Sequence, residues 1–204
     1  NVTDVQMQYS STINKFIILY TYMTSSSNHY LRMAVGTLSG NAGAANKTFT
    51  ISNQVSVGSE NSGYRIGGGS FNSKGNYGGS LPGAGGEMFF APDGSNIKGF
   101  LFSPYCNSGS GDLGAYVVPF TVAANGSLSV GSFTAVTGGN ENAGTIASLN
   151  GYAYSAHYHI PTNQWVLVTT RSSAGYIWMF TQGSGSTTMS QITNDDKINF
   201  GTSG

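Results

Sequence analysis

Three short apolar segments, each entered through a polar turn, place the strongest constraint on how this 204-residue chain can fold. Each segment has the length of a strand and is rich in β-branched or aromatic residues, a pattern typical of a strand buried on both faces. The three segments are residues 14–22, 97–105 and 163–171. Because the pattern recurs, we expect three copies of one structural unit.

The sequence around these segments repeats as well and predicts three further strands in each copy. One strand and a tight turn precede each apolar segment, at 5–9, 87–90 and 154–159. Two strands follow it, the first at 30–35, 115–120 and 176–180 and the second at 48–51, 127–130 and 188–192. We therefore predict an all-β fold of three tandem four-stranded antiparallel units, propeller-like or stacked as a β-repeat.

Almost no helix is expected, because no segment longer than about six residues combines helical apolar spacing with capping residues at both ends. Turn residues are frequent instead. Asn125-Gly126 lies between two predicted strands and is typical of a two-residue hairpin loop. Near the end of the chain, Asp195-Asp196-Lys197 is expected to form a solvated turn.

A glycine-rich insertion at 63–86 separates the first unit, 1–62, from the second, 87–144, and the third, 145–204, follows directly. The three units are expected to form one continuous β domain. The insertion cannot build an ordinary strand core, and we predict either an ordered loop or arm held against a neighbouring surface, or a flexible connection. Its isolated aromatic residues are candidates for contact with a ligand or partner: Tyr64, Phe71 and Tyr77.

The charge of the chain excludes two classes of partner. Charged residues make up 8% of the sequence, and eight basic residues balance eight acidic ones. Electrostatic binding of duplex nucleic acid or of anionic lipid needs a basic excess, so neither is expected as a partner. No apolar run approaches the roughly 20 residues of a membrane-spanning helix, so no membrane insertion is expected. Cys106 is the single cysteine and excludes an internal disulfide.

No motif in the sequence indicates catalysis or a cofactor. The carboxylates fall mostly in turns, and Asp93 in Pro-Asp-Gly is expected to be a turn residue. The chain has no G-x-S-x-G motif, and the glycines at 67–69 lack the lysine and helix of a phosphate-binding loop. We therefore predict no catalytic residue, no cofactor and a protein that is not an enzyme. Since the chain begins at Asn1 without a methionine, we expect a processed chain or part of a longer one.

His157 and His159 alternate along a predicted strand, so both side chains should point to the same face. Two imidazoles do not complete a zinc site, and a third ligand would have to come from His29 or a distant carboxylate. We predict no metal. With Tyr152 and Tyr154 nearby, the two histidines are instead assigned to a polar face that contacts a ligand or partner.

Tyrosine rings and amide side chains are abundant in this chain, which has 12 tyrosines. Rings stack on the apolar faces of sugars, and amides and hydroxyls bond to sugar hydroxyl groups, so such surfaces suit contact with glycan or protein. Three large aromatic residues lie inside the apolar strands and are expected in the core instead: Phe100, Trp165 and Trp178.

In each copy a polar turn leads into the apolar strand, and a Gly/Ser link then leads to a strand that bears tyrosine. The stretches that share this pattern are 15–22 with 30–39, 98–105 with 116–136, and 164–171 with 176–192. The pattern resembles the propeller-like repeats of bacteriophage tail-fibre and other virion proteins, and residues 90–97 look like a turn common in propeller blades. Three blades are fewer than the four to eight that close a ring, so the resemblance leaves open further blades, several chains, or an open array.

The resemblance implies a non-enzymatic virion structural or adhesion protein, such as a phage tail, fibre or decoration component. It would act in host attachment or assembly by surface contact, with other virion proteins, copies of itself or a cell-surface glycan as partners. The resemblance also implies a homo-oligomer, a trimer in a fibre, in the virion or outside the cell. The alternative is a secreted carbohydrate-binding, lectin-like β-propeller module. A third hypothesis, a glycan-cleaving enzyme, requires two carboxylates in one cleft.

Overall fold

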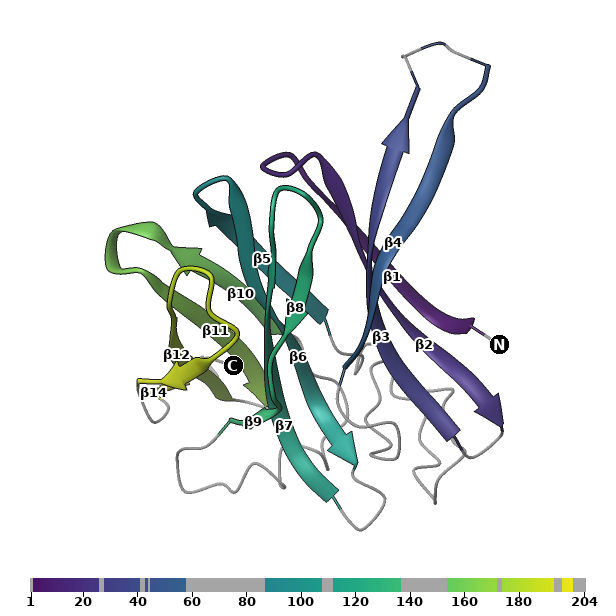
Figure 1. The fold of residues 1–204 in the computed structure, drawn as a ribbon. Coiled ribbons are helices and arrows are strands. Elements are labelled where there is room, and N and C mark those ends of the chain that lie inside the picture. The colour runs from purple at the N-terminus through teal and green to yellow at the C-terminus, as the bar shows by residue number, and fades with distance from the viewer. Residues whose placement is uncertain are drawn as a thin grey trace.

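The computed structural model describes residues 2–25, 28–40, 43, 45–57, 87–107, 112–136, 154–171, 174–192 and 196–199. Within these ranges the chain folds into three antiparallel sheets, each made of strands that follow one another in sequence (Figure 1). The predicted all-β fold and its three four-stranded units are confirmed. The helical part of these ranges is one 3₁₀ turn, Ile160–Thr162.

Each sheet is a meander whose strand order in space follows the order in the chain. The first sheet contains β1 (Val2–Ser10), β2 (Lys15–Ser25), β3 (Asn28–Ser39) and β4 (Thr48–Val57). The second contains β5 (Glu87–Asp93), β6 (Asn96–Asn107), β7 (Asp112–Val122) and β8 (Leu128–Val130), with β9 (Thr134–Ala135) also paired to β7. The third contains β10 (Tyr154–His159), β11 (Gln164–Arg171), β12 (Ala174–Gln182) and β13 (Met189–Gln191), with β14 (Asp196–Asn199) also paired to β12.

Two local predictions were wrong. Asn125-Gly126 does not form a two-residue loop, because the strand pairing stops at Val122 and Leu128 and residues 123–127 make the connection. A hydrogen bond from Gly126 N to Ala123 O closes its turn, at 2.8 Å. The expected turn near residue 196 is instead the start of β14, which pairs with β12. Pairing at the edge of a sheet uses main-chain groups and needs no apolar alternation, so the composition of β14 gave no signal.

The hairpin between the first two strands of each sheet contains one residue with left-handed backbone geometry. These residues are Asn14, Gly94 and Asn163, with φ of 53°, 64° and 56°. Glycine has no Cβ to clash in this region, and asparagine tolerates it better than most residues. The first hairpin of all three units therefore contains a residue that tolerates left-handed backbone geometry.

Strand register allows the three sheets to be compared position by position. Alternate residues of a strand point to opposite faces, and cross-strand partners share a face. We define the leading face of each sheet by Ile17, Phe100 and Val166, whose partners on the third strand are Val35, Pro119 and Met179. We define the trailing face by Ile18, Leu101 and Leu167, whose partners are Ala34, Val118 and Trp178.

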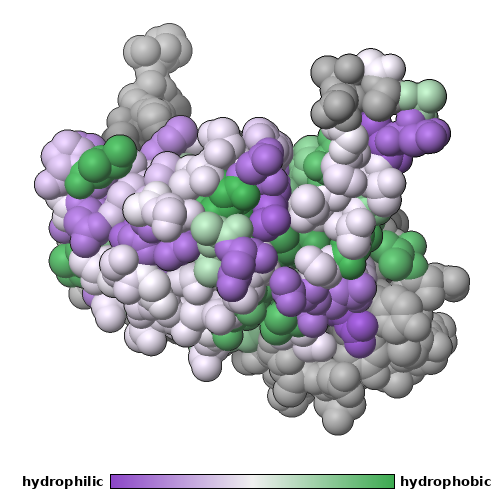
Figure 2. Space-filling view, turned by 45° about the horizontal axis from the view of Figure 1, so that its top comes forward, coloured by the Kyte–Doolittle hydropathy of each residue, from purple (hydrophilic) through white to green (hydrophobic). Residues whose placement is uncertain are grey.

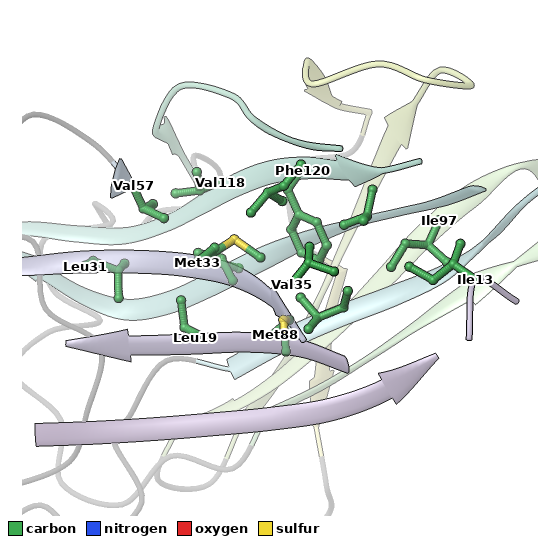
Figure 3. Close-up of a cluster of buried hydrophobic side chains, with 14 residues drawn as sticks. Ile13, Leu19, Leu31, Met33, Val35, Val57, Met88, Ile97, Val118 and Phe120 are labelled. Atoms are coloured by element: carbon green, nitrogen blue, oxygen red, sulfur yellow. The ribbon is translucent and has the colours of Figure 1, made fainter. Parts of the chain in front are cut away.

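The leading face of the first sheet packs on the trailing face of the second. The buried side chains between them are mostly aliphatic or methionine (Figure 3). They include Leu19, Met33 and Val35 from the first sheet and Met88, Leu101 and Phe120 from the second. Burial of each such side chain contributes about 1.5–3 kcal/mol, so this cluster is the main source of cohesion between the two sheets.

The leading face of the second sheet packs in the same sense on the trailing face of the third. This second cluster is rich in rings, with Phe100, Phe102, Trp165, Trp178 and Phe180 all buried. The predicted core positions of Phe100, Trp165 and Trp178 are thus confirmed. The sheets therefore stack head to tail, leading face on trailing face, twice in succession.

β4 contains one extra residue relative to its partner β3. Val35 pairs with Ser52 and Met33 pairs with Val55, so two steps along β3 correspond to three along β4. This is a β-bulge, and Asn53 within it has a φ of 50°. As a result, β4 changes the face to which its odd-numbered residues point: Ile51 pairs with Gly36 on the trailing face, whereas Val55 pairs with Met33 on the leading face.

Candidate functional site

A hollow of about 410 Å³ lies between the first strands of the second and third sheets. β5 supplies one wall, β10 the other, and Gln8 of β1 reaches it from the first sheet. It is thus lined by the first strand of all three units. The main polar and aromatic side chains that line it are Gln8, Glu87, Phe89, His157, Tyr158 and Trp165.

The polar groups at this hollow differ in their hydrogen bonds and in their burial. The amide of Gln8 donates to the carbonyl oxygen of Met88 at 2.8 Å, which links β1 to β5. His157 is exposed on β10. Partial burial raises the pKa of the Glu87 carboxyl above its ordinary value of 4.5. Glu87 is the one carboxylate among the described lining residues, so they do not supply the carboxylate pair used in glycoside hydrolysis.

Aromatic rings connect this hollow to the core between the second and third sheets. The rings of Tyr158 and Trp165 lie 5.0 Å apart, and Trp165 meets Phe100 edge to face at 5.1 Å. Phe100 in turn lies 5.5 Å from Phe89. Contacts of this geometry add to the stabilisation from burial. These contacts fix the positions of Phe89, Tyr158 and Trp165, the aromatic lining residues that we call the ring wall of the hollow.

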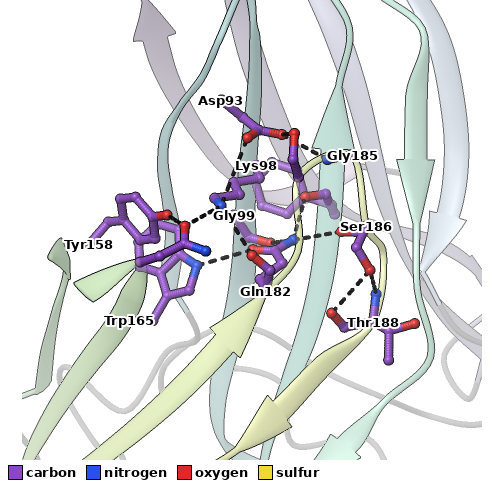
Figure 4. Close-up of polar contacts among 12 residues, drawn as sticks. Asp93, Lys98, Gly99, Tyr158, Trp165, Gln182, Gly185, Ser186 and Thr188 are labelled. Atoms are coloured by element: carbon purple, nitrogen blue, oxygen red, sulfur yellow. Dashed lines mark hydrogen bonds and ion pairs between the residues drawn. The ribbon is translucent and has the colours of Figure 1, made fainter. Parts of the chain in front are cut away.

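A buried lysine lies directly behind the ring wall (Figure 4). Lys98 is 2% exposed, and its Nζ donates to the carbonyl oxygen of Gln182 at 3.0 Å and to Oδ1 of Asn163 at 3.2 Å. A carboxylate oxygen of Asp93 lies 3.8 Å away, and the ring centroid of Tyr158 lies 4.7 Å away. An ammonium group out of water needs this set of partners, because burying a charge is costly unless it is paired and hydrogen-bonded.

The side chain of Gln182 extends the same network into both sheets. Its Oε1 accepts from the indole N–H of Trp165 at 3.0 Å. Its Nε2 lies within hydrogen-bonding distance of the carbonyl oxygens of Gly99, Phe120 and Ser186, at 3.2, 3.1 and 3.0 Å. The network therefore joins β6 and β7 of the second sheet to β11 and β12 of the third. The chain positions that it joins are far apart in sequence.

Asp93 closes the network at the surface. Its Oδ2 accepts from the backbone N–H of Gly185 at 2.7 Å and from the hydroxyl of Ser184 at 3.1 Å. The hairpin loop of the third sheet is thus fixed to the first turn of the second sheet. Asp93, predicted as a turn residue, is the last residue of β5 and directly precedes the turn at Gly94 and Ser95, and its carboxylate has this structural role.

The predicted site residues fall into two groups. His157 and His159 lie on one face of β10, and both are exposed, as the alternation predicted. Nδ1 of His159 lies 2.7 Å from the hydroxyl oxygen of Thr162. Tyr154 begins β10. Four residues lie outside the described part of the chain: Tyr64, Phe71, Tyr77 and Tyr152. No three His, Cys, Asp or Glu residues gather as a metal site within the described ranges.

Sequence reasoning missed one surface, the trailing face of the first sheet. Large apolar side chains are exposed along it from β1, β3 and β4: Val5, Met7, Tyr9, Leu38, Phe49 and Ile51. A row of rings crosses it, with Tyr9 5.1 Å from Phe16 and Phe16 5.4 Å from Phe49. The alternation Val-Gln-Met-Gln-Tyr at 5–9 is the signal that could have revealed it. We call this surface the apolar trailing face.

Figure 2 shows mostly pale or hydrophilic residues on the face that it presents, with small and separate hydrophobic groups. Among the helices of the described residues, none has the length and apolar character needed to cross a membrane.

Comparison of the chain with protein-family models, curated proteins and solved structures found no match.

Proposed function

We propose that the chain is a non-enzymatic structural or adhesion protein of a virion, a component of a phage tail, fibre or decoration layer. Its partners are other virion proteins or copies of itself, and it acts by surface contact. The observation that carries this proposal is the apolar trailing face, a sheet surface with six large exposed apolar side chains in a protein without net charge. Extended apolar surfaces of this kind are typical of protein–protein contact.

The neutral composition supports the same proposal. Contacts between uncharged surfaces depend little on ionic strength, because there is little charge for salt to screen. A particle component has to stay attached in media of very different salt content. Hydroxyl, amide and apolar side chains meet that requirement better than ion pairs do.

Purification of the particles tests this proposal. The chain should band with particles in a density gradient and remain bound after a high-salt wash, as measured by quantitative mass spectrometry. A soluble host protein of similar size serves as the control for trapping. Recovery of the chain in the soluble fraction alone would refute the proposed virion role.

A second candidate function is carbohydrate binding at the hollow between β5 and β10. The observation in its favour is the combination of the Tyr158 and Trp165 rings with the Gln8 amide and the His157 imidazole in one open hollow. Rings that stack on a sugar and polar groups that bond to its hydroxyls are the usual parts of such a site.

Two neighbouring histidines provide a matched test of the carbohydrate site. His157 lines the hollow, whereas His159, on the same face of the same strand, does not. On a glycan array, His157→Ala should lower the signal for a bound glycan several-fold, and His159→Ala should leave it unchanged. Equal loss from both variants, or no glycan bound by the wild-type protein, would exclude this site.

A further inference from the structure

The three sheets are equivalent position by position, so the burial of one face can be compared across them. On the trailing face, Met7, Met88 and Ala156 are equivalent, since they pair with Ile18, Leu101 and Leu167. Met88 is 0% exposed and Ala156 7%, whereas Met7 is 55% exposed. The difference arises because the second and third sheets have a neighbour on this side and the first has none among the described residues.

The fourth strand gives the same result. Phe49, Leu128 and Met189 are equivalent, since they pair with Leu38, Val122 and Gln182. Leu128 and Met189 are 9% and 4% exposed, but Phe49 is 42% exposed. The first sheet therefore has the same kind of apolar trailing face as the other two and lacks the sheet that would cover it.

The third sheet has the complementary surface. At four central positions its leading face carries Val166, Val168, Ile177 and Met179, all half-buried. The equivalent residues, in the same order, are Ile17, Leu19, Met33 and Val35 in the first sheet and Phe100, Phe102, Val117 and Pro119 in the second, and all eight are buried. These four positions are apolar in every sheet, although in the third sheet no described residue packs over them from a following sheet.

One chain thus has both halves of a contact that it already makes twice internally. A leading face packs on a trailing face between the first and second sheets and again between the second and third. The next contact in this series would join the leading face of the third sheet to the trailing face of a first sheet. A second copy of this chain provides that surface, and the absence of net charge means that two copies do not repel each other.

We propose that two copies of this chain associate head to tail, with the leading face of each third sheet packed on the apolar trailing face of the partner's first sheet. Each of the two contacts joins unlike faces, and a two-fold axis relates the two contacts, so the pair closes on itself. The sheets described for two copies number six, within the four to eight that form closed β-propellers, whereas those of three copies would number nine. The inference is independent of the proposed virion role.

Sedimentation velocity of the 204-residue chain tests the proposal first. The expected mass is twice the 21.2 kDa of one chain. A monomer at concentrations where a stable apolar interface would be occupied overturns the proposal, as does a species of three copies. A monomer would favour further β units of a longer chain as the occupant of the apolar trailing face.

Two single substitutions, one on each face, test the geometry. Phe49→Lys and Met179→Lys should each halve the sedimenting mass and leave the far-ultraviolet circular dichroism spectrum unchanged. Thr50→Lys is the matched control for the first, because Thr50 is also exposed and points to the opposite face of β4, and it should remain a dimer. Dissociation by Phe49→Lys together with a dimeric Met179→Lys variant would indicate contact between two first sheets and overturn the proposal.

Mixing the two variants provides the sharpest test. The third sheet of the Phe49→Lys variant and the first sheet of the Met179→Lys variant are both intact. An equimolar mixture should therefore regain a two-copy species held by one contact, although each variant alone is a monomer. A mixture that stays monomeric, with both variants folded, overturns the head-to-tail arrangement.

Discussion

The two interfaces within the molecule have the same geometry and different chemistry. Between the first and second sheets the buried cluster is almost entirely aliphatic (Figure 3). Between the second and third sheets it is aromatic and is bordered by the buried network of Lys98, Gln182 and Asp93 (Figure 4). Equivalent positions differ accordingly: Ile17 corresponds to Phe100.

This difference separates two requirements of sheet packing. Aliphatic burial stabilises contact without defining direction, since the hydrophobic effect scales with area. Ring geometry and hydrogen bonds in addition fix the angle and register of the third sheet on the second. We therefore expect substitutions in the second interface to have larger and more position-specific effects than equivalent substitutions in the first.

The largest effect should come from Phe100→Ala. This change removes a fully buried ring and its contacts with Phe89, Trp165 and Phe180. The expected loss in free energy of unfolding is about 3–5 kcal/mol, measured by urea denaturation at a fixed protein concentration. Ile17→Ala, at the equivalent position of the first interface, is the matched control and should cost less. An equal or greater loss from Ile17→Ala would contradict the contrast between the interfaces.

Lys98→Met should have an intermediate effect. The methionine keeps most of the volume but leaves the Gln182 carbonyl and the Asn163 side chain without the ammonium donor. Buried acceptors that lose a donor cost about 1–3 kcal/mol in free energy of unfolding. The control is Lys15→Met, because Lys15 is the equivalent residue, is partly exposed and donates to the Thr37 hydroxyl at 3.3 Å. Its effect should stay within about 0.5 kcal/mol. Similar losses in free energy of unfolding for both lysine variants would show that the hydrogen-bond network around Lys98 adds no stability beyond that of a partly exposed lysine.

The smallest effect concerns Glu87, whose equivalent in the first interface is Gln6, since they pair with Phe102 and Leu19. Burial raises the pKa of Glu87 in the folded protein. The folded state therefore holds this proton more tightly than the unfolded state, and the stabilisation from protonation is lost as pH rises through the folded pKa. Glu87→Gln should match the wild type below pH about 4 and be slightly more stable near pH 7.

The expected gain at neutral pH is only a few tenths of a kcal/mol, because partial exposure lets solvent screen the charge. Thermal unfolding of both proteins across this pH range measures it. A wild-type protein that gains stability relative to Glu87→Gln as pH rises would reverse the sign and contradict the assignment.

Local pattern was sufficient to predict the three units, because strand signals are carried by neighbouring residues. The apolar run at 163–171 predicted a strand buried on both faces. Trp165 and Leu167 are buried between sheets, but Val166 and Val168 on the opposite face are only half-buried, so the prediction holds for one face. The hairpin at 123–127 escaped prediction because its closing bonds depend on how far the strands remain paired, which two turn residues do not determine. β9 and β14 are too short or too polar to give a signal.

The candidate sites were less predictable because their parts come from distant segments. Lys98 was visible as the polar start of an apolar strand, but its partners Asn163 and Gln182 lie 65 and 84 residues away. Alternation placed His157 and His159 on one face but could not show that only His157 reaches the hollow. Likewise, the repeat predicted equivalent faces without predicting which of them would be left without a neighbour.

The bulge at Asn53 determines how the apolar residues of β4 are shared. In a regular strand, Phe49, Ile51, Val55 and Val57 would all serve a single neighbouring layer. The extra residue divides them into two pairs. Val55 and Val57 pack against the second sheet, whereas Phe49 and Ile51 lie on the apolar trailing face. A one-residue insertion or deletion at this point would therefore change the sheet face on which the apolar side chains of β4 lie, without changing any of those side chains.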